Sequence, residues 1–304
     1  MPRVLVATAL GCRTFTEAGE GEAELAGRKV GALAPEAEGG CLAVVDEQEI
    51  WRRDPGPGWS KVTTTELSLQ SILSVQGTLY AGAMNEAALL RVSATGEVER
   101  LRGFDHVSGR EWWFAGGPPL GVRTLAATVD GSALLAGVHV GGIPRSADGG
   151  ATWVPTLPIE FDVHEVRAHP SMPNLVVAAA AVGLCISRDG GLTWKVRSEG
   201  LEITNSLAVA LLDDQALFSV QEGPFAKSSQ VWRWRIGGDQ IEPVGEGLPP
   251  WLDGKVDTAK IAAGSGRAAI ADQGGSLWRS KDGSRGWERI ATGLPYVFAL
   301  AILP

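Results

Sequence analysis

The chain has 304 residues, with 27 Lys and Arg against 35 Asp and Glu, which gives a formal net charge of −8 at pH 7. This acidic balance argues against nucleic acid or an anionic membrane as the main partner, because both attract clustered basic side chains. The three cysteines, Cys12, Cys41 and Cys185, are far apart, so we expect neither a disulfide framework nor a zinc ribbon, and a cytoplasmic location is the simplest expectation.

Short apolar runs separated by glycine and proline follow one another along the whole chain, without a long stretch of helical periodicity. The predicted fold class is therefore all-β. An N-terminal strand is expected at 3–9, in an apolar stretch too short to cross a membrane as a helix, and a C-terminal strand at 297–303. Between them, the first strands of successive units are expected to begin near Lys29, Ser68, Val122, His164, Ser206 and Asp257.

One sequence pattern recurs four times and sets the period of the chain. An aspartate is followed five residues later by a tryptophan at Asp54, Asp148, Asp189 and Asp282. The spacing fits a period of about 46 residues, with degenerate copies expected near 95–96 and 237–238. Because a four-stranded propeller blade takes about 40–50 residues, this period predicts a β-propeller.

The copies around Asp148 and Asp189 match the motif S-x-D-x-G-x-T-W in full. On this motif the chain resembles the BNR, or Asp-box, repeat proteins of the sialidase-like propeller superfamily. Within it, the chain is similar to bacterial stand-alone propellers described as WD40/YVTN/BNR-like or glycosyl-hydrolase-like. The resemblance implies that the motif closes a hairpin on the face opposite the binding mouth. A carboxylate before Gly-Gly is also a turn device, so we expect these aspartates to be structural.

We predict one domain, residues 1–304, with seven blades, because about 43 residues per blade fits the period. The N- and C-terminal strands would pair and close one blade, which leaves no long unpaired sheet edge. Six blades is the alternative, because residues 10–30 carry few blade markers.

Ligands of propellers gather at the mouth of the central channel, where the inner strands converge. Five polar residues are predicted to reach this mouth from four consecutive blades. His164, Asp257 and Glu222 are candidate catalytic residues, and Arg123 and His139 are candidate ligand-binding residues, with Arg123 as an anion clamp. The alternative for each is a structural hydrogen bond, a turn or a solvated loop.

The segment 103–120 is the longest interruption of the repeat and joins one blade to the next on the same face. It carries Trp113 and Phe114, and Trp113 is a candidate for stacking on a sugar ring. The alternative is that this loop packs against its own blade. Glu165 and Arg167, two positions apart on one strand, predict a structural ion pair between blades.

These residues favour a propeller whose mouth binds a small polar or anionic, carbohydrate-like ligand. One alternative is a glycoside hydrolase or lyase in which Asp257 pairs with Glu222 or Asp162, because glycoside hydrolysis uses two carboxyls roughly 5–10 Å apart. Another is a non-catalytic scaffold that docks a protein. A true sialidase is not expected, because the Arg-Ile-Pro signature of sialidases is absent and Tyr296 is the one tyrosine placed to reach the mouth.

No cofactor is expected. The alternative is a divalent metal near His139 and His164, completed by a carboxylate such as that of Asp257, since imidazole and carboxylate ligands suit zinc and related ions.

Overall fold

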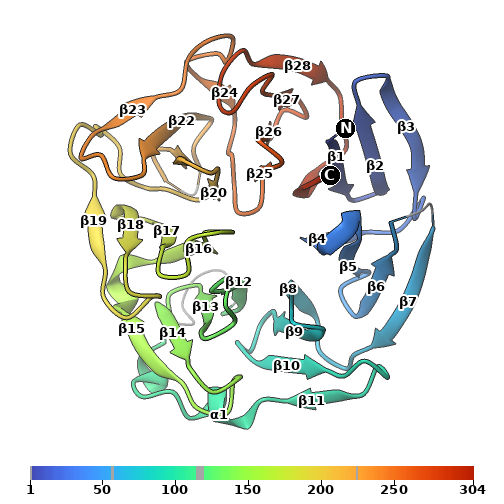
Figure 1. Ribbon diagram of the computed structural model, residues 1–304, viewed down its shortest axis with the longest axis vertical. Helices are drawn as coiled ribbons and strands as arrows, with labels where there is room; N and C mark the ends of the chain where they lie inside the picture. Colours follow the sequence, from blue (N-terminus) through green and yellow to red (C-terminus); the bar gives the residue numbers. More distant parts are fainter. Residues whose placement is uncertain (1, 56–57, 114–119, 224) are drawn as a thin grey trace.

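The computed structural model describes residues 2–55, 58–113, 120–223 and 225–304. Within these residues, seven antiparallel sheets stand in a ring, each with its first strand toward the centre (Figure 1). The protein is a seven-bladed β-propeller. The predicted blade number is confirmed, and the six-blade alternative is wrong.

Each blade runs from an inner strand to an outer one. Blades 1 to 4 are formed by β29 (Val297–Leu303), β1 (Arg3–Thr8), β2 (Gly11–Thr16), β3 (Gly19–Glu24); β4 (Val30–Pro35), β5 (Cys41–Val45), β6 (Glu49–Arg53), β7 (Trp59–Thr64); β8 (Leu69–Val75), β9 (Thr78–Ala83), β10 (Leu89–Val92), β11 (Val98–Arg100); and β12 (Val122–Ala127), β13 (Leu134–Val138), β14 (Ile143–Ser146), β15 (Val154–Leu157). Blades 5 to 7 are formed by β16 (Val163–Ala168), β17 (Val176–Ala180), β18 (Gly183–Ser187), β19 (Lys195–Arg197); β20 (Val209–Leu211), β21 (Gln215–Val220), β22 (Ser228–Arg235), β23 (Ile241–Pro243), with β24 (Leu252–Asp253) beside β22; and β25 (Ile261–Gly264), β26 (Arg267–Ala271), β27 (Leu277–Arg279), β28 (Glu288–Ala291).

The two ends of the chain meet in blade 1. Strand β29 pairs antiparallel with β1, from Arg3 opposite Leu303 to Thr8 opposite Val297. The labels of the two termini accordingly lie close together in Figure 1. The ring is thus closed by hydrogen bonds between the terminal strands, as the sequence predicted, and β1 has a paired strand on each side.

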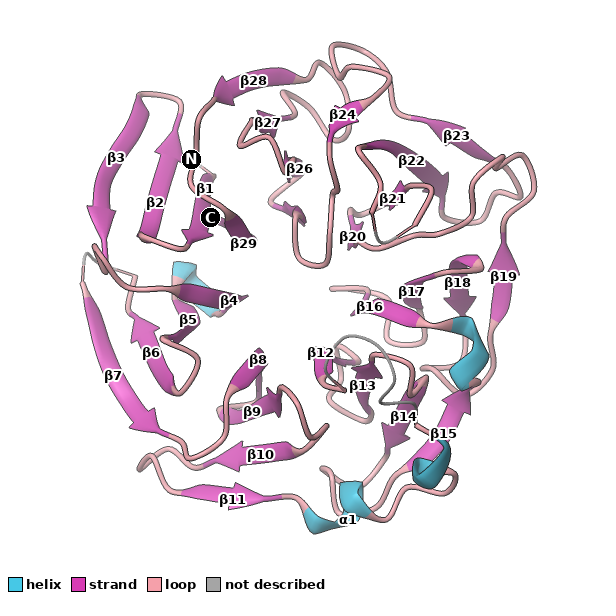
Figure 2. Cartoon of the chain, turned by 180° about the vertical axis from the view of Figure 1, so that it is seen from behind, coloured by secondary structure: helices cyan, strands magenta, loops and turns pink. Residues whose placement is uncertain are grey.

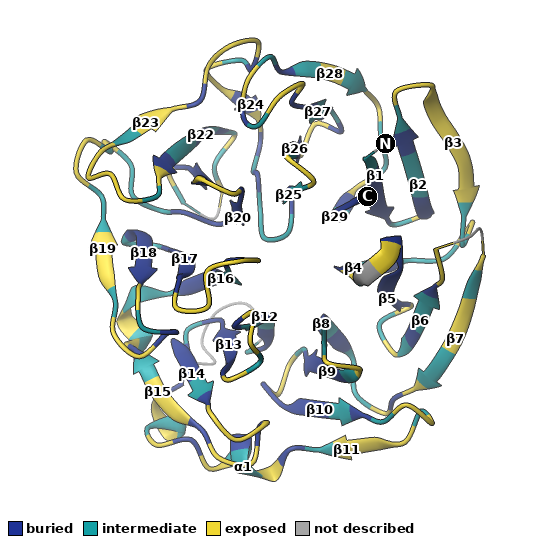
Figure 3. Cartoon of the chain, in the orientation of Figure 1, coloured by how far each residue is buried: buried dark blue, intermediate teal, exposed yellow. Residues whose placement is uncertain are grey.

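Burial follows the order of the strands within each blade (Figure 3). Every residue of β5 and β17 is buried, whereas β3 on the outside is almost entirely exposed. The sequence of β17, Val-Val-Ala-Ala-Ala, is apolar at each position because a strand packed between two neighbouring blades is covered on both faces. Clusters of buried side chains lie between adjacent blades, such as Leu135 of blade 4 with Val166 of blade 5.

The aspartates of the two complete motifs close the turns between the third and fourth strands of blades 4 and 5. The Asp148 carboxylate accepts hydrogen bonds from the hydroxyls of Ser146 (2.8 Å) and Thr152 (2.6 Å) and from the backbone N–H of Thr152 (2.9 Å). These hydrogen bonds, led by the Thr152 hydroxyl, lower the pKa of Asp148 to about 2. The Asp189 carboxylate makes the same set of bonds. Their role in the turn is therefore structural, as expected.

In the residues that the structure describes, helices are found only in short connecting segments (Figure 2). They are α1 (Arg102–Asp105), η1 (Ala37–Gly39), η2 (Arg110–Trp112) and η3 (Ile159–Phe161). None of the helices in the described residues is long and apolar enough to cross a membrane. The three cysteines are buried and unpaired. Phe114, in the predicted aromatic loop, lies outside the described residues.

Candidate functional site

A β-bulge near the start of five inner strands shapes the centre of the ring. In β4, β8, β12, β16 and β29 the pairing with the next strand skips the second residue; these residues are Gly31, Gln70, Arg123, His164 and Phe298. A bulged residue leaves the ladder, and its side chain is re-aimed. The same local irregularity, repeated from blade to blade, therefore brings residues that are distant in sequence to one level of the channel.

A cavity of about 250 Å³ lies between the inner strands, and four of the five bulged residues line it. Its charged lining consists of four cationic and two acidic side chains: Lys29, Arg123, Arg167 and Lys260, with Glu47 and Asp257. Pockets for drug-sized ligands have volumes of about 300–1,000 Å³, so this cavity suits a smaller molecule. Its cations outnumber its acids although the whole chain is acidic.

A loop of the chain between β24 and β25 reaches into the centre of the ring (Figure 1) and carries Asp257. The prediction that Asp257 opens the inner strand of blade 7 is wrong, because β25 begins at Ile261. Instead, its carboxylate accepts a hydrogen bond from Arg123 (2.9 Å), which also donates to the hydroxyl of Thr258 (2.9 Å). Burial opposes ionisation of Asp257, but Arg123 and the Thr258 backbone N–H outweigh it and lower the pKa of this carboxyl.

Lys260 ends the same loop and lines the cavity, although only 2% of its surface is exposed. Its ammonium lies 4.2 Å from the centre of the Tyr296 ring, a cation–π contact. In the described part of the chain, this ammonium has no hydrogen-bond acceptor and no acidic partner within 4.0 Å. Burial lowers the pKa of Lys260 to about 8, and the carboxylate of Asp257 opposes that shift.

Glu165 and Arg167 of β16 form the ion pair that the sequence predicted. The Glu165 side chain is fully buried and also accepts hydrogen bonds from the backbone N–H groups of Val209 (2.9 Å) and Ala259 (3.2 Å). Burial raises the pKa of Glu165. The carboxylate thus joins blade 5 to blade 6 and to the loop before blade 7, which is a structural role.

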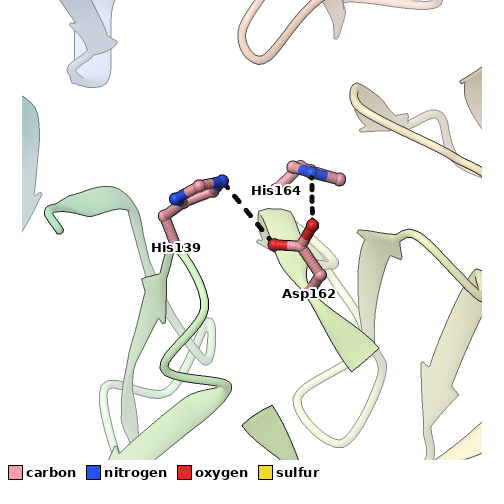
Figure 4. Close-up of side chains that lie close together, drawn as sticks. All are labelled: His139, Asp162 and His164. Carbon is pink, nitrogen blue, oxygen red and sulfur yellow. Dashed lines mark ion pairs between the residues drawn. The ribbon is translucent and has the colours of Figure 1, made fainter. Parts of the chain in front are cut away.

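Two histidines and an aspartate form a second polar group at the boundary of blades 4 and 5. The Nε2 atoms of His139 and His164 lie 3.6 Å and 3.5 Å from the two carboxylate oxygens of Asp162, and the three side chains point toward one another (Figure 4). Burial, and next the Arg123 guanidinium, lower the pKa of His139 to about 4. His139 is therefore neutral near pH 7.

The predicted site residues are brought together only in part. Arg123 and Asp257 are bonded across the cavity, and His139 and His164 share Asp162. Glu222 lies on an exposed turn after β21, and no hydrogen bond or ion pair of the described residues joins it to the others. Tyr296 lines the cavity, as expected for the one tyrosine placed to reach the mouth.

Trp113 is 7% exposed and packs in a hydrophobic cluster. Its ring centre lies 5.6 Å from that of Phe104, and the Arg110 guanidinium lies 4.6 Å from the Trp113 ring. This placement favours the alternative, in which the loop packs against its own blade.

Sequence reasoning missed Lys260 and Arg167 as cavity residues, and it named Asp257 rather than Asp162 as the carboxylate beside the histidines. The position of Lys260 and Asp162 relative to the inner strands could have identified them. The residue directly before an inner strand is Lys29 in blade 2, Asp162 in blade 5, Lys260 in blade 7 and Tyr296 in blade 1. These four side chains all reach the cavity or the histidine group.

No protein-family model matches the chain, and no curated protein matches it in sequence. Membership of the BNR repeat proteins therefore stays a prediction.

Solved structures share the propeller fold. A GH74 enzyme from Niastella koreensis superposes with a TM-score of 0.64 at 14% identity, covering 94% of this chain and 46% of its own length. A GH74 xyloglucanase from Xanthomonas campestris gives a TM-score of 0.62 at 17% identity, covering 95% and 46%. The periplasmic gluconolactonase of Pseudomonas aeruginosa gives a TM-score of 0.68 at 12% identity, covering 100% and 99%. This chain thus spans about half of either glycoside hydrolase, and the likeness shows the fold alone.

Proposed function

We propose that the central cavity binds a small anionic ligand, of the class of sugar acids. The observation that carries this proposal is Lys260, a buried cation that lines the cavity without an acidic partner in the described part of the chain. A buried charge is stabilised when a partner of opposite charge neutralises it. The acids of the cavity already have partners, because Glu47 pairs with Lys29 (2.6 Å) and Asp257 with Arg123 (2.9 Å). An anionic ligand would supply the missing partner.

The aromatic rings of the lining support a ligand with a sugar-like skeleton. Tyr296 and Phe298 stack edge to face with ring centres 4.8 Å apart, and Lys29 lies 4.9 Å from the Phe298 ring. Aromatic faces pack on the apolar faces of sugar rings, while the adjacent ammonium groups suit a carboxylate. The names of two structural neighbours, a xyloglucanase and a gluconolactonase, are consistent with a carbohydrate-related ligand and do not bear on its charge.

The lowered pKa values of Asp257 and Asp162 do not favour a glycosidase in which these are the two catalytic carboxyls. Such an enzyme needs a general acid whose pKa is raised. The pKa of Asp257 and that of Asp162 are both lowered, the latter chiefly by the side chain of His164 against the opposing effect of burial. Glu165 has a raised pKa, but it is fully buried and bonded to two backbone N–H groups. We therefore propose binding and assign no hydrolysis.

Calorimetric titration with glucuronate and with glucose tests this proposal, because the two sugars differ by a carboxylate. We expect glucuronate to bind and glucose to bind at least tenfold more weakly. The substitution Lys260→Met should weaken glucuronate binding at least tenfold, whereas Lys195→Met, the same change on an exposed outer strand, should leave it unchanged. Equal affinity for both sugars, or unchanged binding by Lys260→Met, would contradict the proposal.

Glucuronate stands for a class, so the titration is repeated with gluconate, citrate and sulfate. A protein that binds none of these anions would favour the docking-scaffold alternative.

A further inference from the structure

The group of His139, Asp162 and His164 has no place in the proposed anion site, because none of the three lines the cavity. His139 directly follows β13 of blade 4, and Asp162 and His164 flank the first residue of β16 in blade 5. One potential ligand atom from each of the three lies within 4.8 Å of the other two. Three such ligand atoms close together form a candidate site for a metal ion.

The ring of His164 is held so that its Nε2 faces the group. Its Nδ1 lies 2.8 Å from the carbonyl oxygen of Ser206. A carbonyl oxygen only accepts, so Nδ1 must carry the proton that is donated. With Nδ1 engaged in this way, Nε2 is the ring atom that remains for a ligand, and it lies 3.5 Å from the carboxylate of Asp162. Metal-binding histidines commonly donate their other ring N–H to a backbone carbonyl in this way.

The separations between the ligand atoms match a shared ion better than a direct bond. Good N–H···O hydrogen bonds have a donor–acceptor distance of about 2.7–3.2 Å, shorter than the 3.5 Å and 3.6 Å found here. Two ligand atoms on a tetrahedral zinc ion, with bonds of about 2.0–2.1 Å, lie about 3.3–3.4 Å apart. The three ligand atoms lie within 4.8 Å of one another, so side-chain rotation would have to bring the widest pair closer together on one ion.

The carboxylate itself is incompletely satisfied. The Oδ1 atom of Asp162 is buried, and among the residues that the structure describes it has no hydrogen-bond partner. A buried carboxylate oxygen without a donor is costly, and a cation compensates for it directly. This oxygen is the one that faces His139.

We propose that His139, Asp162 and His164 bind one divalent transition-metal ion through the Nε2 atoms and the carboxylate, with Zn²⁺ as the best match. Two imidazoles and a carboxylate suit Zn²⁺ and other divalent first-row transition metals, whereas Ca²⁺ and Mg²⁺ prefer sites made of oxygen ligands. Three protein ligands leave one position open for water or a ligand group, which is the arrangement of catalytic rather than structural zinc sites. The metal site shares no residue with the cavity lining. A test of metal binding is therefore independent of a test of anion binding.

Titration of the metal-free protein with Co²⁺, followed by visible absorption and by displacement with Zn²⁺, tests the metal site. We expect one saturating equivalent of Co²⁺ with the intense bands of four- or five-coordinate cobalt, which Zn²⁺ abolishes. Asp162→Asn and His164→Ala should each weaken binding at least tenfold. His106→Ala removes an exposed histidine outside the group and should leave binding unchanged.

A second measurement guards against variants that fail to fold. Asp162→Asn keeps the shape of the side chain, and its unfolding midpoint is compared with that of the wild type in EDTA and in Zn²⁺. We expect Zn²⁺ to raise the midpoint of the wild type and to have no such effect on Asp162→Asn. Absence of saturable Co²⁺ and Zn²⁺ binding by the wild type would overturn the metal site, as would wild-type affinity in both Asp162→Asn and His164→Ala.

Discussion

Arg123 and Asp257 are 134 residues apart in sequence, yet their side chains form an ion pair of 2.9 Å that joins blade 4 to the loop before blade 7. The same loop is held by the hydroxyl of Thr258, which donates to the carbonyl of His164 (3.1 Å), and by the backbone N–H of Ala259, which donates to Glu165. These contacts fasten the loop to the inner strands of blades 4 and 5, and so position Lys260 in the cavity.

Arg123 and Asp257 should be energetically coupled. Each side chain is less than one-fifth exposed, and removing one partner leaves a largely buried charge. Urea unfolding of Arg123→Met, Asp257→Asn and the double variant should give a coupling free energy of about 1–3 kcal/mol. Strictly additive effects would show that the pair does not hold the loop.

Lys260→Met should raise the free energy of unfolding at pH 7 by up to about 3 kcal/mol, because burial lowers the pKa of this lysine from 10.5 to about 8. The folded state disfavours the charged form, so between about pH 8 and 10.5 the unfolded chain binds more protons. This group therefore makes wild-type stability rise with pH over that interval.

The Lys260→Met variant should lack this rise in the free energy of unfolding with pH. Denaturant unfolding between pH 7 and 10.5 measures it. Lys195→Met is the matched control. A Lys260→Met protein less stable than the wild type at pH 7 would contradict the assignment of Lys260 as a binding residue kept at a cost in stability.

Binding of glucuronate should weaken as the pH rises through about 8. Lys260 is protonated below its pKa, and it then attracts the carboxylate of the ligand. The charged and titratable groups that face it are Asp257, Lys255, Asp272 and Tyr296, and the pKa of Tyr296 is raised by its partial burial and by Asp257. Calorimetry from pH 6 to 9.5 should show this loss in the wild type and a flatter profile in Lys260→Met. Identical profiles would show that another group governs binding.

Glu165→Gln should destabilise the protein by about 2–4 kcal/mol, because it leaves Arg167 without its buried carboxylate and disturbs the hydrogen bonds to Val209 and Ala259. Glu99→Gln, which changes the exposed ion pair between Arg91 and Glu99 on the outer strand β11, should alter stability by less than about 1 kcal/mol. Chemical unfolding of both variants is the check. Equal effects would mean that the carboxylate of Glu165 does not join the blades.

Asp148→Ala should lower the unfolding midpoint and leave glucuronate and Co²⁺ affinity unchanged. Within the described part of the chain, its carboxylate bonds only to the turn that contains it. Differential scanning calorimetry beside the two titrations separates the effects. A loss of ligand affinity at an unchanged unfolding midpoint would instead place the Asp-box turn in the binding site.

The blade number was predictable because its signals are local. The turn around Asp148 depends on residues within four positions of it, so the motif survives as a readable pattern. Pairing of β29 with β1 was predictable for a different reason, since no outer strands follow β29 in the chain and no inner strand precedes β1.

The site was less predictable because it depends on bulges and on one long loop. Counting blades placed Arg123 and His164 at the channel, but the bulges that redirect them leave no mark in residue type. Asp257 was assigned to a strand, whereas it lies in the loop before Ile261 and meets Arg123 there. Trp113 lies in a run of aromatic residues, and such a run is equally compatible with a surface for stacking on a ligand and with a hydrophobic cluster. The packing of Trp113 in the structure distinguishes the two.

The most direct measurement is a crystal structure of the protein with glucuronate bound. We predict a carboxylate in the central cavity, within hydrogen-bonding distance of the Lys260 ammonium and beside the rings of Tyr296 and Phe298. Glucuronate bound elsewhere on the propeller, with the cavity holding water alone, would contradict an anion site at the centre of the ring.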